Sequence, residues 1–493
     1  MDIRSVWITE TNYVHLAFGN SPINNHLIMR KIAIIIQLFV LVVSCTKSND
    51  LHTFYKQNET ATYVAPRRSS VLSYEDIDSF VRERKGGVIT RNSDEYDIKP
   101  ITHAGNTIMY LVNYTDGWEL LSGDIRLEPI IAYCASGNIT EKDLFSNPAQ
   151  SDVFNGLAQC LDSLVSNPVE ICENIETKGN PTPPHTYYDS DGRWWVFAYR
   201  YLSSQSTQTQ NPLTGLKWGQ GYKSYPLLTN RKWNICMPYR SPSLTARCYA
   251  GCSPVAGAQV LVYLHNKYGT PASFYKNSTC SAYLADTTSI VTLNTSNTTF
   301  SNYGNYWSLL PSEGNGASDD QFIAASSLLL HMGKLTGANY KYHGTAAGLD
   351  DIKTAFSTYG YNSTLSYNYI DIFRTQIYVN KLPIIVRIVG QRVTPTSTTT
   401  LDHAVVPEGY QRSTEVYTYV YKNGDSGTFE YQTHQYTFTY DYVSVNWGYD
   451  GDGEYNSSGD VIWHNLNSVL YRTFSNGTDT GTITEMLYGF TKK

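Results

Sequence analysis

Three residues of types that support nucleophilic catalysis lie far apart in the chain: Cys252, His403 and Asn446. Cys252 is followed by Ser253, Pro254 and an apolar run, so the sequence predicts that the thiol lies at the start of a helix. The unpaired N–H groups and the positive dipole end at such a position stabilise a thiolate. A thiolate nucleophile also needs a base and a group that orients the base. His403, at the start of a strand-like run, and Asn446, at the end of another, supply these types.

The positions of these residues require a helix for the thiol and strands for the other two. Residues 255–265 have the apolar pattern of a buried helix, and a second helix is predicted to begin at the acidic pair 319–320 and to end at Gly333. Further on, the chain has the composition of strands. The strand-like runs are 383–389, 403–406, 416–421, 436–440 and 443–447. Helices followed by strands indicate an α+β domain.

A smaller unit precedes this domain. Residues 74–85 have the pattern of a short amphipathic helix, and strand-like runs follow at 107–113, 118–121 and 129–134. These elements predict a compact α+β unit that closes near residue 175. The prolines within 178–185 then mark a linker.

Four blocks of sequence resemble those of the streptopain-like cysteine peptidases, papain-fold bacterial enzymes made with an N-terminal inhibitory prodomain. Residues 250–259 are similar to the family's nucleophile segment, and residues 217–221, Lys-Trp-Gly-Gln-Gly, are similar to its Trp-Gly-Gln block. Residues 403–405 resemble its base segment, and residues 445–448, Val-Asn-Trp-Gly, resemble its closing block. The order Gln, Cys, His, Asn with a Trp after the Asn is more specific than any single block.

The resemblance extends over residues 210–465, and residues 110–136 are similar to the family's prodomain strands. It implies a papain-like catalytic domain, with a helical part and an antiparallel β-sheet part, preceded by a small α+β prodomain. The implied division is a dispensable N-terminus with an export signal at 1–45, a tether at 46–70, an inhibitory prodomain at 71–180 and the catalytic domain at 190–493.

The resemblance also implies a role for each matched residue. Cys252 would attack the peptide carbonyl, and His403 would hold the thiol proton and pass it to the leaving amine. Asn446 would orient the imidazole. The side chain of Gln220 and the backbone N–H of Cys252 would bind the oxyanion.

Two further residues belong to this implied site, and two features depart from the family pattern. Trp447 would shield the contact between Asn and His from water, and Gly251 lies in the segment that faces the substrate. The family usually has Gly before the catalytic His, whereas this chain has Asp402, which would raise the pKa of the imidazole if it pointed inward. The His and the Asn are 43 positions apart, which predicts a β-hairpin insertion around 410–440 beside the cleft.

Some residues have competing interpretations. Cys248 is close enough in sequence to pair with Cys252 or Cys236 in an oxidising compartment, and a disulfide at Cys252 would exclude the nucleophile. Residues 450–454, in which acidic residues alternate with glycine, fit either calcium ligands or a turn. His434 and His464 are competing candidates for the base, but they lack a neighbouring block and are predicted to be surface residues. No cluster has convincing metal-site spacing, so no metal or cofactor is predicted.

Residues 29–45 have the pattern of an export signal. Two basic residues follow Met29, an apolar run covers 32–43, and Ser44-Cys45 ends the segment. The run is too short to span a bilayer, which needs about 20 apolar residues. Met29 is therefore a candidate start. The ending resembles a bacterial lipoprotein box, which implies lipidation of Cys45 and an outer-membrane anchor; an ordinary secretory signal is the alternative.

The composition agrees with a protein that works outside the cytoplasm. The 493 residues include 37 Lys and Arg against 43 Asp and Glu, so a nucleic-acid partner is not expected. Charged residues make up 16%, below the roughly 25% of an average soluble protein, and the 41 tyrosines favour a β-rich fold.

Two functions from different classes fit these observations. The first is an exported cysteine endopeptidase, made as a zymogen and acting on protein or peptide substrates. The second is a catalytically silent surface lipoprotein that uses the same fold for binding or adhesion. The complete set of Gln, Cys, His and Asn favours the peptidase, because a binding protein does not require all four.

Overall fold

The computed structural model describes much of the chain beyond residue 67. The described residues are 68–84, 96–168, 170–171, 183–184, 186–221, 233–238, 247–269, 279–283, 290–294, 306–340, 345–367, 371–394, 397–424, 430–467 and 483–493. All of them belong to one compact unit, Ala65–Lys493. The predicted export signal and Cys45 lie outside the described residues. Within those residues, no helix is long and apolar enough to cross a membrane.

The N-terminal region, residues 68–171, contains helices packed on an antiparallel sheet. The predicted helix and the three predicted strands are present, and the sequence had not indicated β2 or α4. The elements are β1 (Arg68–Ser69), α2 (Tyr74–Arg84), β2 (Tyr96–His103), β3 (Asn106–Tyr114), β4 (Gly117–Ser122), β5 (Ile130–Cys134), α3 (Glu141–Leu144), α4 (Pro148–Ser166) and β6 (Glu170–Ile171). Helix α4 begins after Asn147, whose side chain accepts a hydrogen bond from the Gln150 N–H.

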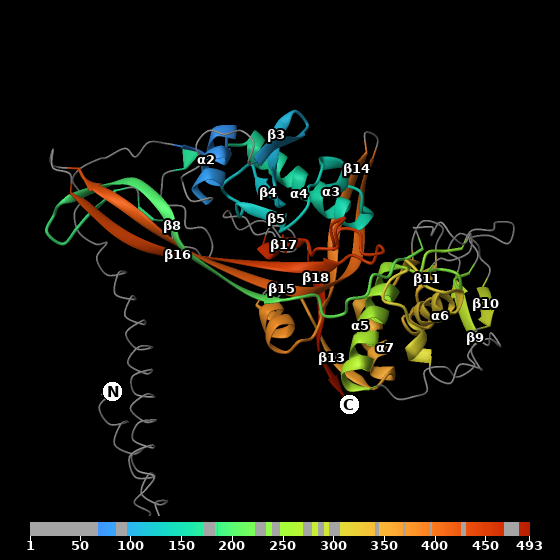
Figure 1. Ribbon diagram of the computed structural model, residues 1–493. Helices are drawn as coiled ribbons and strands as arrows, with labels where there is room; N and C mark the ends of the chain where they lie inside the picture. The colour runs from blue at the N-terminus through green and yellow to red at the C-terminus, as the bar shows by residue number, and fades with distance from the viewer. Residues whose placement is uncertain are drawn as a thin grey trace, which may run out of the picture. The chain divides into compact units, whose positions relative to one another are not determined.

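A helical part follows. Its main elements are α5 (Cys252–Tyr268), η4 (Tyr306–Leu309), α6 (Asp319–Leu335) and α7 (Leu349–Thr358), with the short strand pairs β9 (Thr279–Tyr283) with β10 (Ile290–Asn294) and β11 (Asn339–Tyr340) with β12 (Thr345–Ala346). Figure 1 shows α5, α6 and α7 grouped together. Helix α5 is buried on nearly all sides, which explains its continuous apolar sequence.

Helix α6 differs from its predicted boundaries. Its N-cap is Ser318, which forms a capping box with Gln321, so the acidic pair lies in the first turn instead of capping it. Gly333 lies inside the helix instead of ending it. A Cβ atom at this position would overlap the hydroxyl of Tyr340, so the glycine serves close packing.

A twelve-stranded sheet joins the C-terminal half of the chain to the N-terminal region. Its C-terminal strands are β13 (Tyr361–Ser366), β14 (Ile385–Thr394), β15 (Ser397–Asn423), β16 (Tyr431–Asn446), β17 (Trp463–Asn465) and β18 (Ile483–Lys492), with η5 (Arg374–Val379) before β14. The strand order is β13-β18-β14-β15-β16-β17-β5-β4-β3-β2, and each pairing is antiparallel. The fold is therefore α+β, as predicted.

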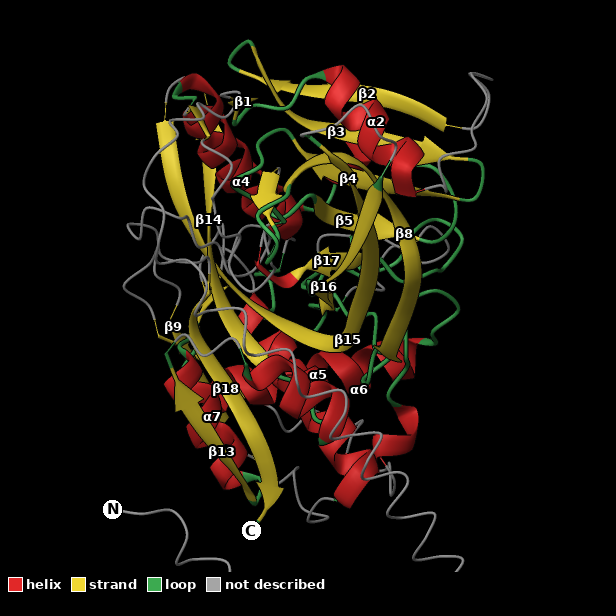
Figure 2. Ribbon diagram, turned by 90° about the vertical axis from the view of Figure 1, so that its left-hand side faces the viewer, coloured by secondary structure: helices red, strands yellow, loops and turns green. Residues whose placement is uncertain are grey.

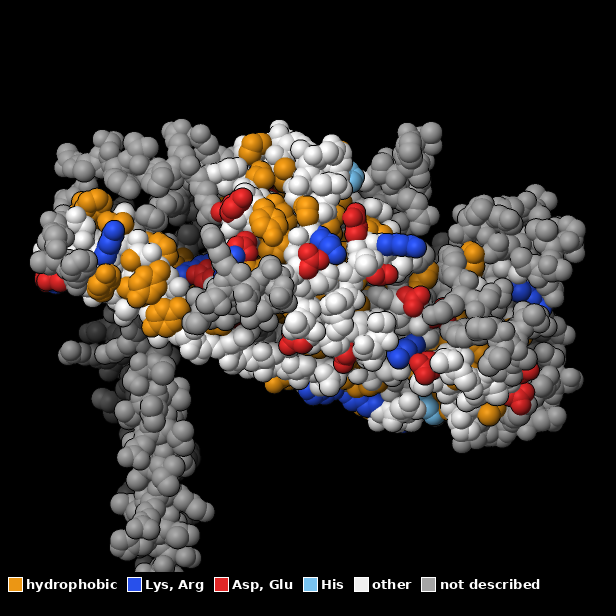
Figure 3. All heavy atoms as spheres, turned by 45° about the horizontal axis from the view of Figure 1, so that its top comes forward, with side chains coloured by type: hydrophobic (Ala, Val, Ile, Leu, Met, Phe, Trp, Pro, Cys, Tyr) orange, Lys and Arg blue, Asp and Glu red, His pale blue; other side chains and the backbone are white. Residues whose placement is uncertain are grey.

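The predicted hairpin insertion is present and longer than 410–440, because β15 and β16 extend on both sides of that range. Strand β8 (Trp194–Gln210) pairs with β15 along residues 410–423, and β7 (Thr186–Tyr188) pairs with β8. Figure 1 shows β8, β15 and β16 running side by side. We call β8 with residues 410–423 and 431–440 the ribbon. Figure 3 shows hydrophobic side chains gathered on it, and Tyr199 and Tyr201 are among its exposed aromatic residues.

The hydrophobic core is shared between the N-terminal region and the sheet. Phe154 and Leu157 of α4 belong to the same buried cluster as Val443 of β16 and Trp447. Figure 2 shows α4 beside β14 and β3, which it contacts. A second cluster lies between the sheet and helices α5, α6 and α7. The first residues of α5 therefore lie where helices and sheet meet.

Candidate active site

Cys252 is the first residue of α5, as the sequence predicts. The preceding Gly251 has φ +93°, a conformation that side chains rarely adopt, and a Cβ atom there would lie 2.8 Å from the Thr345 Cβ. Thr345 in turn donates a hydrogen bond to the carbonyl of Tyr249, at 2.8 Å. A glycine is therefore needed for the chain to turn into the helix at this point. The Cys252 side chain is half-buried and is not in a disulfide.

His403 of β15 lies beside this thiol. Burial by the surrounding protein raises the pKa of Cys252, but a hydrogen bond with the His403 side chain, the charge of the imidazolium and the Ala404 N–H outweigh it, so that the pKa lies below its ordinary value. A lowered pKa makes the thiolate available as a nucleophile. The helix and the sheet thus bring together two residues that are 151 positions apart in the sequence.

Gln220 lies in the segment next to the nucleophile. Its carbonyl accepts a hydrogen bond from the Ala250 N–H at 3.0 Å, and Gly219 forms a β-bridge with Tyr449. The side chain is buried, yet its Nε2 atom has no acceptor among the described residues. A buried donor without a partner costs about 1–3 kcal/mol. Such an atom is available to an oxygen that arrives with a ligand.

Asn446 ends β16 and is almost fully buried. Its Nδ2 donates a hydrogen bond to the Leu216 carbonyl, and its Oδ1 accepts one from the Gly448 N–H at 3.0 Å. These bonds tie the start of the following turn to the segment that leads to Gln220. The contact between Asn446 and the imidazole that the resemblance implies stays a prediction.

Trp447 is buried directly after Asn446. Its indole N–H donates to the Gly453 carbonyl at 3.2 Å, and its ring packs edge-on against His464, with the centroids 5.5 Å apart. The prediction that His464 is a surface residue is wrong, because the ring is completely buried. Burial lowers its pKa to about 4, so His464 is neutral at ordinary pH. It packs against the tryptophan, which the sequence did not indicate.

Asp402 does not face the imidazole. Its carboxylate forms an ion pair with Arg387 of β14 at 2.6 Å, and neighbouring residues of a strand point to opposite faces. The condition under which Asp402 would raise the pKa of His403 is therefore not met. Tyr449, which the sequence analysis did not single out, packs near the imidazole, with its ring centroid 6.4 Å from that of His403. The only indication of Tyr449 in the sequence was an aromatic residue directly after the Asn-Trp-Gly block.

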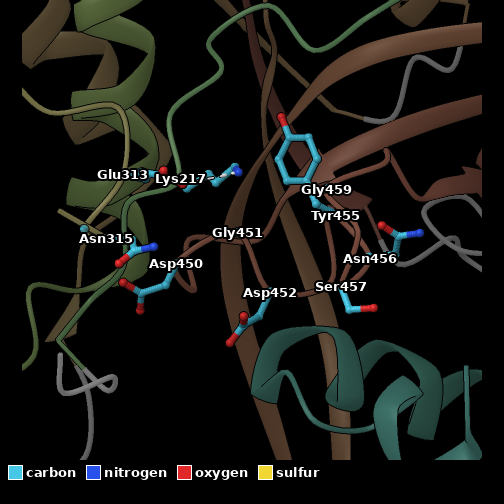
Figure 4. Close-up of a pocket in the computed structure, with 11 residues that line it drawn as sticks. Lys217, Glu313, Asn315, Asp450, Gly451, Asp452, Tyr455, Asn456, Ser457 and Gly459 are labelled. Carbon is cyan, nitrogen blue, oxygen red and sulfur yellow. Dashed lines mark hydrogen bonds and ion pairs between the residues drawn. The ribbon is translucent and has the colours of Figure 1, made fainter. Parts of the chain in front are cut away.

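A polar cavity of about 240 Å³ lies beside this site, between residues 217 and 313–315 and the turn at 450–459. Figure 4 shows the side chains around it, including Asp450 and Asp452. Lys217 forms an ion pair with Glu313 at 3.3 Å and lies 4.7 Å from the centre of the Tyr455 ring.

The acidic residues of this turn do not converge on one point. Asp450 accepts a hydrogen bond from the Trp233 indole, and Asp452 lines the cavity, whereas Glu454 is completely buried and does not line it. Among the described residues, no group of three or more His, Cys, Asp or Glu is placed to hold a metal ion. Of the two interpretations of residues 450–454, the turn agrees with the structure, since the Asp452 N–H bonds to the Tyr449 carbonyl.

Comparison with known proteins found a family model and a solved structure that are similar to this chain. The model of the Peptidase C10 family matches residues 229–456, which include Cys252, His403 and Asn446. None of the curated proteins matches the chain. A solved fragment of prointerpain A from Prevotella intermedia, carrying a Cys-to-Ala mutation, is 17% identical with a TM-score of 0.43, and the match covers 80% of this chain and 99% of that one.

The protein is a cysteine-type peptidase, a hydrolase, and its α+β fold agrees with this class. Residues 229–456 are similar to the Peptidase C10 family, the family of streptopain.

Proposed function

We propose that the protein is an exported cysteine endopeptidase, made as a zymogen, whose reaction depends on a Cys252–His403 thiolate–imidazolium pair. The observation that carries this proposal is the hydrogen bond between the two side chains, together with the lowered pKa of the thiol. A catalytically silent adhesin would have no use for a thiol poised in this way. The family match supports the hydrolysis of peptide bonds in protein substrates.

The reaction follows from these positions. The Cys252 sulfur forms a bond to the carbonyl carbon, and the negative charge moves to the carbonyl oxygen. The free Nε2 donor of Gln220 and the Cys252 N–H hold that oxygen. The C–N bond then breaks as His403 gives its proton to the leaving amine. Water, deprotonated by His403, releases the acyl group and restores the thiolate.

The neighbouring residues support this chemistry. Asn446 would orient the imidazole, the buried ring of Trp447 would keep water from that contact, and Gly251 lets substrate approach the nucleophile closely.

Residues 71–180 are proposed to be the inhibitory prodomain. The contacts of the N-terminal region with the turn that follows Trp447 support this role. Asn147 donates a hydrogen bond to the Asp452 carbonyl, and Asn456 donates to the Ser136 carbonyl at 2.9 Å. A domain that binds this turn through hydrogen bonds is well placed to control access to the site. Proteolysis between this domain and the catalytic domain at 190–493 would release it.

Export is proposed from the sequence of residues 29–45. Lipidation of Cys45 would anchor the protein in the outer membrane, and cleavage of the chain would release the catalytic domain. Labelling with radioactive palmitate tests this point: a Cys45→Ser variant should lose the label and appear in the medium, whereas retention of the label would contradict lipidation.

The Cys252→Ala variant tests the catalytic proposal. It should accumulate at full length and should not cleave casein, because no other residue supplies the nucleophile. Cys236→Ala is the matched control, since its thiol is half-buried and burial raises its pKa. This control should mature normally. Maturation and casein cleavage by purified Cys252→Ala would refute the mechanism.

A further inference from the structure

Two completely buried carboxyl groups, those of Glu408 and Glu454, lie against each other next to Asn446. Glu408 lies on β15, five residues after His403, and Glu454 lies in the turn that begins after Trp447. Neither has a role in the chemistry described above. Together they join the strand that carries the base to the turn that follows Asn446.

The backbone places both groups there specifically. The ladder between β15 and β16 shifts register between Pro407 and Gly409, so Glu408 is the extra residue of a β-bulge. A bulge re-aims a side chain and is typical of strands beside active sites. Glu454 is held on both sides, because its N–H bonds to the Gly451 carbonyl at 3.2 Å and its carbonyl accepts from the Ile462 N–H at 2.8 Å.

The hydrogen bonds of the two carboxyl groups require a proton between them. One oxygen of Glu408, Oε2, accepts the Thr214 N–H at 2.6 Å. The other three oxygens are buried and have no donor in good hydrogen-bond geometry among the described residues. Two neighbouring carboxylates cannot both stay charged in such an environment. If one group is protonated, its O–H donates to an oxygen of the other group, which gives two of these three oxygens a partner.

The surrounding groups support a single shared proton. Burial raises the pKa of Glu408, and burial followed by the charge of Glu408 raises that of Glu454. The groups that face the pair and act in the opposite direction are Thr214 and Asn446 next to Glu408, and Tyr455 and Lys217 next to Glu454. They favour one negative charge on the pair. The nearby His464 is neutral and adds no charge.

We propose that Glu408 and Glu454 share one proton and thereby clamp the turn after Asn446 to β15, as positioning residues of the peptidase site. The inference rests on the proposed roles of His403 and Asn446. Loss of the proton at alkaline pH would place two charges side by side, push the turn away from β15 and displace Asn446 and Trp447 from the imidazole.

The first test measures stability and needs no catalytic activity. It uses the full chain in the Cys252→Ala background, which prevents self-cleavage. A carboxyl pair that keeps its proton when folded but ionises when unfolded loses stability as pH rises above about 4.3, the ordinary pKa of a glutamate, so the melting temperature should fall with rising pH. Glu454→Gln, whose amide donates an N–H at every pH, should flatten this fall. Glu485 is a single carboxylate on β18, so the Glu485→Gln variant should keep the fall of melting temperature with pH.

The second test measures kinetics of the processed enzyme on a fluorogenic peptide. Glu454→Gln should retain kcat within about twofold near pH 6 and should lose less activity than the wild type at alkaline pH. Glu454→Ala, which leaves Glu408 charged and without its partner, should lower kcat about tenfold or more, with KM changed less than about twofold.

Two results would overturn the inference: the same pH slope of stability in Glu454→Gln as in the parent, or an unchanged kcat in Glu454→Ala. If Glu454→Ala does not fold, the pH dependence of stability in Glu454→Gln still tests the inference. An inactive wild-type enzyme would refute the proposed function, whereas the stability test would still show whether the proton is shared.

Discussion

At the scale of single residues, the candidate site contains buried polar atoms whose partners are distant in sequence or lie outside the described residues. The Asn446 amide bonds to the Leu216 carbonyl, 230 positions earlier, and the buried Gln220 Nε2 has no acceptor within the described part of the chain. The sequence allowed the residue types to be identified through their blocks. It did not reveal the contacts of Asn446 or the pairing of Glu408 with Glu454, because both depend on a bulge and a turn whose geometry no periodicity encodes.

Replacing Gln220 with Ala should lower kcat about 10²–10³-fold, because the variant loses one donor for the oxyanion. KM should change little, since the bond strengthens mainly in the transition state. Steady-state kinetics with a peptide substrate measure both values. Gln376 is a buried glutamine on η5 that has no role in the proposed reaction, so Gln376→Ala should keep kcat. Equal losses of kcat in the two variants would argue against the role of Gln220.

At the scale of elements, strongly patterned segments were predictable and weakly patterned ones were not. The apolar run after Cys252 identified α5. This helix is buried on nearly all sides, and such burial requires a continuous apolar sequence. Strand β8 has a Ser-, Gln- and Thr-rich sequence without alternation, because much of it is exposed in the ribbon and no face needs to be apolar. The end of α6 was misjudged at Gly333, since a glycine chosen for close packing resembles one that ends a helix.

The ribbon contacts α2 through ion pairs that the sequence did not indicate. Arg84 bonds to the buried Glu415 of β15 at 2.6 Å, and Arg200 of β8 pairs with Glu83. Arg84→Ala should destabilise the folded chain by about 3–5 kcal/mol, because Glu415 would stay buried without its cation.

Urea denaturation of the chain in the Cys252→Ala background measures this loss. Arg193, directly before β8, is exposed and forms ion pairs with Asp189 and Asp191, so Arg193→Ala should cost no more than about 1 kcal/mol. Similar values for the two arginines would mean that the burial of Glu415 does not matter.

At the scale of the whole molecule, the N-terminal region is joined to the rest through shared core residues and a continuous sheet. Glu128, in the segment between β4 and β5, lies at this junction. The pKa of Glu128 is raised to about 7, mainly by burial and to a smaller extent by the charge of Asp441. A hydrogen bond with Asn467 lowers this pKa in part. Docking of the N-terminal region therefore favours the protonated carboxyl group.

The junction should weaken as pH rises from about 4.5 to about 7, because the free carboxyl ionises while docking requires the proton. Hydrogen exchange of β5 and β17 in the Cys252→Ala chain should accelerate over this range. Glu128→Gln should reduce this dependence. Unchanged pH dependence in that variant would assign the effect to another group.

The pairing of β5 with β17 has one more consequence. If residues 71–180 are removed, as proposed, β17 becomes the edge of the remaining sheet, and Trp463, now 6% exposed, becomes more exposed. Open edges with aromatic side chains invite strand exchange and aggregation. Strand β17 is only three residues long, which offers an approaching chain few hydrogen bonds. The shortness of this strand would thus help the enzyme to remain monomeric after the proposed release of residues 71–180.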